Sequence, residues 1–296
     1  MQDILTCAMG LDVHRDIIVA RLAKGELGAD PEIEIRSFST LVPEMKKLRD
    51  WVLEAGCHHI AMESTGIYWQ PIYEMLEPCF EGKINILVVN ARHMKNVPGR
   101  KTDMRDAQWI ATLLRAGLLK GSFIPDKTFR ELRHLTRYRK SIVHDITAQK
   151  NRIDKFLQSS GFRFTAFLSD AFGASGRNII RHLIQNGSID RAALDKCLKT
   201  QTRKRIDQIL IALNGSLSIH QRSFLAMTFG HLESLEAHRK AVEDAITGEI
   251  LKHSEALYLL CSIPGIDVTA AAAIIAEIGT DMSSFFLLKQ RTTASL

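Results

Sequence analysis

The sequence predicts an α/β domain with a mixed β-sheet, followed by a region of long helices. Three strand-like segments open the chain, and helical and strand-like segments then alternate, which is typical of this class. The second region is predicted by a run without Gly or Pro in residues 129–160, where apolar residues recur at helical spacing. With 296 residues, 46% of them hydrophobic and 24% charged, the chain has an ordinary globular composition and room for about two domains.

The first domain is predicted element by element from its apolar patterns. Three strands are expected in residues 4–13, 17–25 and 32–40, joined by short polar or glycine-containing turns. Apolar residues at helical spacing then predict a helix that ends at Gly56. The elements expected after it are a strand in 58–63, a helix around 68–77, a strand in 84–90 and a helix from about Thr102 to about Leu119.

Four carboxylates stand at or near the ends of these elements. Asp12 ends the first strand, Glu63 ends the strand HHIAME, and Asp103 and Asp106 open the following helix, where a spacing of three places them on one face. Because ligand sites in such sheets favour the carboxyl ends of strands, we expect the four side chains to converge. Such an oxygen-rich pocket suits magnesium, which supports phosphodiester chemistry.

Each acid also has a plainer interpretation. Asp12 can simply begin the turn before His14, and Glu63 can be an exposed residue that precedes a helix. Asp103 can cap the start of the helix, and Asp106 can be a negative charge that the positive helix end favours. The residues alone leave both interpretations open.

Positive charge gathers in one segment. Residues 120–160 hold ten Lys or Arg against four Asp or Glu, an excess equal to the net charge of +6 of the whole chain. Within it Arg133, Arg137 and Lys140 form a ridge along the long helix, which favours nucleic acid over the alternative of a solvated helix face. A second basic segment precedes the acidic helix and is expected to bring phosphate towards it: Arg92, Lys95, Arg100 and Lys101.

We predict three regions: an α/β domain in residues 1–125, a basic helical region in 126–255 and a small helical domain from 256 to 296. A second long helix, expected from about His220 to Leu257, makes a helical hairpin or a dimerisation arm. Five cysteines without CxxC spacing predict buried thiols in a reducing cytoplasm. Neither a signal peptide nor a membrane span is expected.

Several motifs together resemble the IS110 family of insertion-sequence transposases: GLDVH, AMESTGIYW, NARHMKNVPGRKTDMRDAQWIATLLRAGLL and IPGIDVTAAAAIIAEIG. The resemblance implies a RuvC-like first domain, a variant of the ribonuclease H fold, with an acidic tetrad of Asp12, Glu63, Asp103 and Asp106 that binds magnesium. It also implies DNA recombination guided by an RNA from the element, and a homodimer or higher homo-oligomer.

The end of the chain departs from the family pattern. After Gly279 the family continues to a serine that attacks DNA, but here the text is TDMSSFFLLKQRTTASL, and no residue in it matches that serine. We expect a truncated C-terminal domain, the alternative being a diverged but complete one. The Pro-Gly segment around Gly265 resembles a helix-hairpin-helix element, although Asp267 stands where a second glycine is usual. A structural helix pair and a DNA clamp both stay open there.

Three functions compete at this point. The first is a magnesium-dependent transposase with an RNA partner, and the second is a resolvase-like nuclease that cuts by metal-activated water. The third is an inactive remnant that binds DNA or RNA. An actin-like ATPase is disfavoured, because Val13, His14 and Arg15 occupy the place where a phosphate-binding loop needs glycine and hydroxyl residues.

Overall fold

The computed structural model describes residues 3–64, 66–80, 85–90 and 106–282. The chain folds into two compact units, Met1–Ile124 and Pro125–Leu296, and each has its own hydrophobic core. The units are called unit 1 and unit 2 below. The predicted division into three regions, with boundaries after residues 125 and 255, stays a prediction.

Unit 1 is built on a mixed sheet, as predicted. Its described residues form five strands in the order β3-β2-β1-β4-β5. β2 is antiparallel to both β1 and β3, whereas β4 is parallel to β1 and to β5. This arrangement is that of ribonuclease H-like folds. The strands are β1 (Cys7–Val13), β2 (Ile17–Lys24), β3 (Glu32–Ser39), β4 (His59–Glu63) and β5 (Asn85–Val89).

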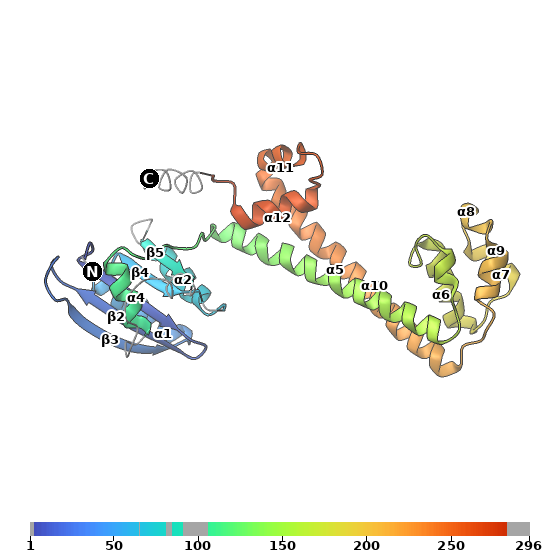
Figure 1. Cartoon of the computed structure of the whole chain (residues 1–296), viewed down its shortest axis with the longest axis horizontal. Coiled ribbons are helices and arrows are strands. Elements are labelled where there is room, and N and C mark those ends of the chain that lie inside the picture. The colour runs from blue at the N-terminus through green and yellow to red at the C-terminus, as the bar shows by residue number, and fades with distance from the viewer. Residues whose placement is uncertain (1–2, 65, 81–84, 91–105, 283–296) are drawn as a thin grey trace. The chain divides into compact units, whose positions relative to one another are not determined.

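Helices cover both faces of this sheet, because successive side chains of a strand point to opposite faces. On one face Met9 and Leu11 of β1 join a core with α1 (Val42–Glu54) and α2 (Trp69–Leu76). On the other face Ala8 packs with residues of α4 (Asp106–Arg115). Figure 1 shows α4 lying over the strands. A short 3-10 helix, Glu77–Phe80, follows α2.

The α4 helix ends earlier than the sequence predicted. It stops at Arg115 rather than near Leu119, because Gly117 takes a left-handed conformation with φ of 68°. Arg115 is 2% exposed and fixes this end of the helix by donating to the carbonyl oxygens of Leu5 at 3.1 Å and Glu26 at 2.9 Å. The predicted start of the helix near Thr102 lies outside the described residues.

Unit 2 is organised around a hairpin of two long helices, which confirms the long-helix prediction. In Figure 1, α5 (Lys127–Ser159) and α10 (Ile219–Ile250) lie side by side along their length. Apolar residues of both helices, among them Ile146 of α5 and Phe229 of α10, form the core. α5 ends just before Gly161, whose φ of 87° cannot continue a helix.

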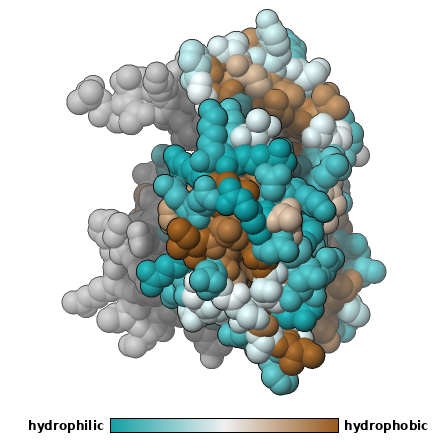
Figure 2. All heavy atoms as spheres, turned by 90° about the vertical axis from the view of Figure 1, so that its right-hand side faces the viewer, coloured by the Kyte–Doolittle hydropathy of each residue, from teal (hydrophilic) through white to brown (hydrophobic). Residues whose placement is uncertain are grey.

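Shorter helices gather at the two ends of this hairpin (Figure 1). One end carries a 3-10 helix, Phe164–Phe167, and four helices: α6 (Ala174–Asn186), α7 (Arg191–Cys197), α8 (Thr200–Arg203) and α9 (Ile206–Ala212). Figure 2 faces this end and shows a mainly hydrophilic surface with separate apolar areas. Exposed Ile211 and Ile219 belong to these short helices and to the start of α10.

At the other end the structure corrects the predicted helix from His220 to Leu257. α10 stops at Ile250, and a 3-10 turn, Leu251–His253, separates it from α11 (Ser254–Cys261). The break lies at His253, whose φ of −118° and ψ of 39° leave helical geometry while its ring packs 4.7 Å from that of Phe129. α12 (Val268–Ile278) then folds back against α5.

Candidate acidic site and nucleic-acid interface

The parallel pairing of β1 with β4 brings two of the predicted acids to the same place. Leu11 pairs with Met62, so continuing the register by one residue puts Asp12 beside Glu63. Side chains alternate along a strand, and both acids therefore lie on the face that α4 covers. The sequence placed each acid at the end of a strand, but only this register makes them neighbours.

Gly10 allows α4 to come close enough to add a third acid. A Cβ atom at Gly10 would lie 2.4 Å from the carbonyl oxygen of Ala107 and 2.5 Å from the nitrogen of Ala111, so the helix backbone rests directly on the strand. α4 begins at Asp106, one residue before Ala107. Asp12 follows Gly10 by two residues and lies on the same face of β1. It is therefore near the start of α4.

The electrostatic environment of Asp12 includes the other two carboxylates. Burial raises the pKa of Asp12 above 3.8, and the negative charges of Asp106 and Glu63 raise it further. His14 opposes the shift: its Nε2 lies 3.2 Å from Oδ2 of Asp12, whose side chain is 17% exposed. Burial and like charges destabilise the ionised form of this carboxylate. A cation bound beside it would stabilise that form.

The donor set has the chemistry that magnesium prefers, which is carboxylate oxygen. As the side chains stand, however, no group of three or more His, Cys, Asp or Glu within the described ranges is arranged to hold a metal ion. Asp103, the fourth predicted ligand, lies outside the described residues. The structure therefore gathers Asp12, Glu63 and Asp106 but does not bring them into a finished coordination shell.

Sequence reasoning did not assign a role to Gly10 or His14. The signal for Gly10 was available, because a glycine inside a strand pattern often marks the close approach of another backbone. His14 stands in the turn after β1, where its backbone N–H donates to the carbonyl oxygen of Ile17 at 2.9 Å. Its position two residues after Asp12 offered a weaker signal, since a turn histidine is common.

The predicted basic ridge on α5 contacts α12. Arg133 donates to the carbonyl oxygens of Ala276 at 3.3 Å and Glu277 at 2.6 Å, which lie at the end of α12, where helix carbonyls lack partners. Arg137 donates two hydrogen bonds to the carboxylate of Glu277, and these bonds lower the pKa of that group. Both arginines are thus engaged inside unit 2.

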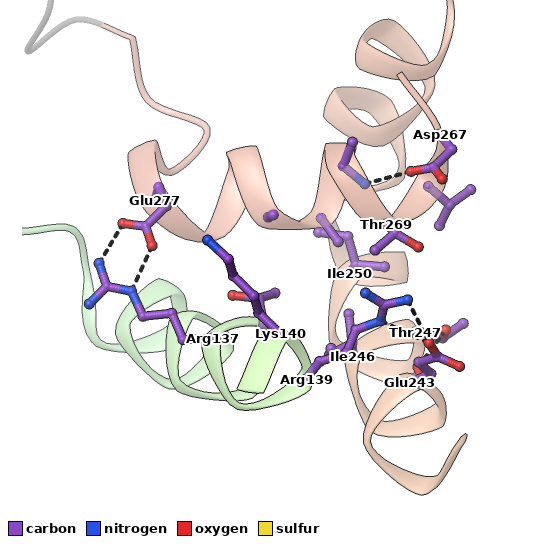
Figure 3. A pocket seen from close by; sticks show the side chains of 15 residues that line it. Arg137, Arg139, Lys140, Glu243, Ile246, Thr247, Ile250, Asp267, Thr269 and Glu277 are labelled. Carbon is purple, nitrogen blue, oxygen red and sulfur yellow. Dashed lines mark hydrogen bonds and ion pairs between the residues drawn. The ribbon is translucent and has the colours of Figure 1, made fainter. Parts of the chain in front are cut away.

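Lys140 differs from the two arginines. It lines a cavity of about 810 Å³ between α5, α10 and α12, and among the described residues it has no ion-pair partner (Figure 3). The cavity also holds the ion pair of Arg139 with Glu243 at 2.7 Å. Arg137, Asp267 and Glu277 also line it, and the rest of its walls are apolar or hydroxylated, for example at Ile246 and Thr269. The other predicted contacts, Arg92, Lys95, Arg100 and Lys101, lie outside the described residues.

The Pro-Gly segment forms a turn between α11 and α12. Gly265 takes a φ of 89°, and the carboxylate of Asp267 caps α12 by accepting from the backbone N–H of Ala270 at 2.7 Å. The acid that replaces the usual glycine therefore occupies the helix start that a phosphate would use in a DNA clamp. This favours the interpretation as a structural helix pair.

The comparison with family models agrees with the motifs. The family model for DEDD transposases of the IS110 type, described as Transposase, matches residues 9–161. Among solved structures, RuvC of Thermus thermophilus matches with 13% identity and a TM-score of 0.27, over 39% of this chain and 99% of that chain. No curated protein matches the sequence.

No helix in the described part of the chain combines the length and the apolar character needed to cross a membrane. The family match spans more than half of the sequence and includes Asp12, Glu63, Asp103 and Asp106. It confirms the family that the motifs indicated, and with it an activity in DNA transposition. The chain belongs to the IS110 family of DEDD transposases.

Proposed function

We propose that Asp12, Glu63, Asp103 and Asp106 hold magnesium and that this site acts on DNA phosphodiesters during transposition. The observation that carries the proposal is the meeting of Asp12, Glu63 and Asp106 where β1 and β4 end and α4 begins. Asp103 joins the set through its match to the family motif. When bound, magnesium would activate an attacking oxygen and stabilise the leaving one.

The residues around the site have supporting roles in this proposal. His14 contacts Asp12 and restricts the orientation of its carboxylate, while Gly10 fixes the distance between β1 and α4. Because its pKa is raised, Asp12 takes up a proton more readily than an ordinary aspartate when no cation is present. Metal and proton therefore compete for Asp12.

The partners in this proposal are DNA and an RNA encoded by the element, bound by a homodimer or higher homo-oligomer in the cytoplasm. Phosphates would contact Arg133, Arg137 and Lys140 on α5, together with Arg92, Lys95, Arg100 and Lys101. The spacing of the three α5 residues along one helix face supports this, as does the position of Lys140 in the cavity of unit 2. Because Arg133 and Arg137 contact Glu277, phosphate must replace a carboxylate there.

The test uses the full chain with DNA containing the ends of the element, with and without transcribed RNA, in magnesium or EDTA. We expect strand breakage or rejoining that requires magnesium and is lost in Asp12→Asn and Asp106→Asn. Asp16→Asn is the matched control, because Asp16 carries the same charge in the neighbouring turn with its side chain 86% exposed.

The products separate the competing functions. A covalent protein–DNA adduct indicates recombination through a serine, whereas free ends indicate a resolvase-like nuclease that needs only the acids. Nucleic-acid binding without breakage in any divalent metal would show an inactive remnant and would overturn the proposed chemistry. If Asp12→Asn kept its activity, the acidic site would have no part in the reaction.

A further inference from the structure

Two cysteines far apart in the sequence meet at the end of β1 that is remote from Asp12. Met9 of β1 pairs with Ile60 of β4, so the register carried back puts Cys7 level with His58, directly beside Cys57. A second connection leads to the same place. Cys7 pairs with Lys24 of β2, and Lys24 Nζ donates to the carbonyl oxygen of Ala55 at 3.2 Å, two residues before Cys57.

Both side chains belong to the same core. Cys57 is fully buried among the residues between the sheet and α1, and partly exposed Cys7 packs against that core. The thiol of Cys57 donates a hydrogen bond to the carbonyl oxygen of His59 at 3.3 Å, and Cys57 lies near enough to Cys7 to influence its pKa. Neighbouring strands lie about 4.8 Å apart, so Cys57, one residue from the position level with Cys7, is within reach of the Cα separations of about 4.4–6.8 Å that disulfides span.

The two thiols differ in reactivity. The hydrogen bond from Cys57, with the positive charges of Lys24 and Arg115, lowers the pKa of Cys7 to about 7 against the opposing effect of burial. The same hydrogen bond and burial raise the pKa of Cys57. Cys7 is thus the partly exposed thiol whose thiolate attacks first, and Cys57 is the buried thiol that resolves it.

We propose that Cys7 and Cys57 form a peroxide-sensitive pair that closes to a reversible intramolecular disulfide. The oxidant is a hydroperoxide such as hydrogen peroxide. The Cys7 thiolate attacks one peroxide oxygen, the S–O bond forms, the O–O bond breaks and hydroxide leaves, so sulfur is oxidised to a sulfenic acid while peroxide is reduced.

The second step uses Cys57. Its sulfur attacks the sulfur of Cys7, the S–S bond forms, the S–O bond breaks, and the departing hydroxide takes the Cys57 proton to leave as water. The bond joins the start of β1 to the connection between α1 and β4. Because Asp12 stands at the other end of β1, we expect the disulfide to stabilise unit 1 against unfolding rather than to disturb the acidic site.

The experiment treats the reduced full chain with a small excess of hydrogen peroxide, alkylates the remaining thiols under denaturing conditions and maps the peptides. We expect the alkylated cysteines to fall from five to three, with a linked Cys7–Cys57 peptide pair that dithiothreitol separates. Thermal unfolding should move to a higher midpoint in the oxidised protein and return after reduction.

Variants distinguish the two roles. Cys57→Ser should stop at a sulfenic acid on Cys7 that dimedone traps, whereas Cys7→Ser should leave Cys57 reduced. Cys261→Ser is the matched control, because Cys261 is also partly exposed, and it should keep the linked pair. Full alkylation of Cys7 and Cys57 in the peroxide-treated wild type would overturn the proposal. Irreversible oxidation of Cys7, or its linkage to another chain, would overturn it as well. These three outcomes are measured on the wild type and do not depend on how the variants fold.

Discussion

Arg137 of α5 holds Glu277 of α12 through two hydrogen bonds, from Nε to Oε1 at 2.8 Å and from Nη2 to Oε2 at 2.9 Å. The sequence predicted Arg137 as a contact for phosphate, and Glu277 presents the planar pair of oxygens that a guanidinium also recognises in nucleic acids. The two interactions exclude each other at one side chain. The position of α12 and the binding of nucleic acid are therefore linked in our proposal.

Removing the charge of Glu277 should release the arginines for phosphate. We expect Glu277→Gln to bind nucleic acid a few-fold more tightly than the wild type, with a salt dependence steeper by about 0.9 for each cation released. Fluorescence anisotropy at several salt concentrations measures both effects. Glu249→Gln is the control with the same charge change, because Glu249 pairs with Lys252 elsewhere in unit 2. Weaker binding by Glu277→Gln would contradict the competition.

Arg133 and Lys140 should respond differently to substitution. Arg133→Ala leaves the last carbonyl oxygens of α12 without their donor, and we expect a loss of about 1–3 kcal/mol in the free energy of unfolding. Lys140→Ala should leave stability unchanged and reduce the salt slope of nucleic-acid binding by about 0.9. Urea unfolding and binding titrations of both variants check this. An unchanged free energy of unfolding in Arg133→Ala would refute the role of Arg133 in holding α12. Unchanged nucleic-acid binding in Lys140→Ala would refute Lys140 as a contact for phosphate.

Magnesium should stabilise the wild type and not the variants that lose a ligand. A ligand at ten times its Kd adds about 1.4 kcal/mol to the free energy of unfolding. We expect thermal unfolding to move upwards with magnesium in the wild type, and this shift to disappear in Asp12→Asn. Without metal, Asp12→Asn should be slightly more stable than the wild type, since it removes a charge that burial and two other acids disfavour. Calorimetric titration gives the affinity directly.

The acidic site should also give a defined dependence on pH. The pKa of Asp12 is raised above 3.8 in the folded chain, so the folded state binds this proton more tightly than the unfolded state. Its contribution to stability is therefore complete below the unfolded value and is lost as pH rises through the raised value. Without metal, the wild type should therefore lose stability relative to Asp12→Asn as the pH rises above about 4, the ordinary value for an aspartate. Saturating magnesium should reverse that loss, and a pH-independent difference would contradict the assignment.

Gly10 should matter to both stability and metal binding. A methyl group there would meet the backbone of α4, so we expect Gly10→Ala to cost about 1–3 kcal/mol and to move Asp106 away from Asp12, which weakens magnesium binding. Gly248→Ala is the control, because a Cβ atom at that position in α10 meets nothing within 4 Å and alanine favours the helix by about 0.5–1 kcal/mol. Unchanged magnesium affinity in Gly10→Ala would show that the approach of α4 does not set the site.

The sequence by itself determined the class of the fold and the family. Short apolar runs between turn residues gave the strands of unit 1, and the run without Gly or Pro gave α5, because these local patterns depend only on which residues of an element are buried. The place of Asp12 at the end of a buried strand was visible for the same reason. The boundary of α10 was predicted wrongly: the helix ends at Ile250, and His253, where the backbone leaves helical geometry, contacts Phe129, far away in the chain.

Tertiary structure alone decided which of these residues meet. The pairing of β1 with β4 makes Asp12 and Glu63 neighbours, and the close approach of α4 over Gly10 adds Asp106. Whether Arg137 meets phosphate or a carboxylate, and whether Cys7 meets another thiol, also depends on segments far away in the sequence. The spacing of residues along the chain determines which of them share a face of a helix or strand. Which other element that face contacts depends on how the whole core packs.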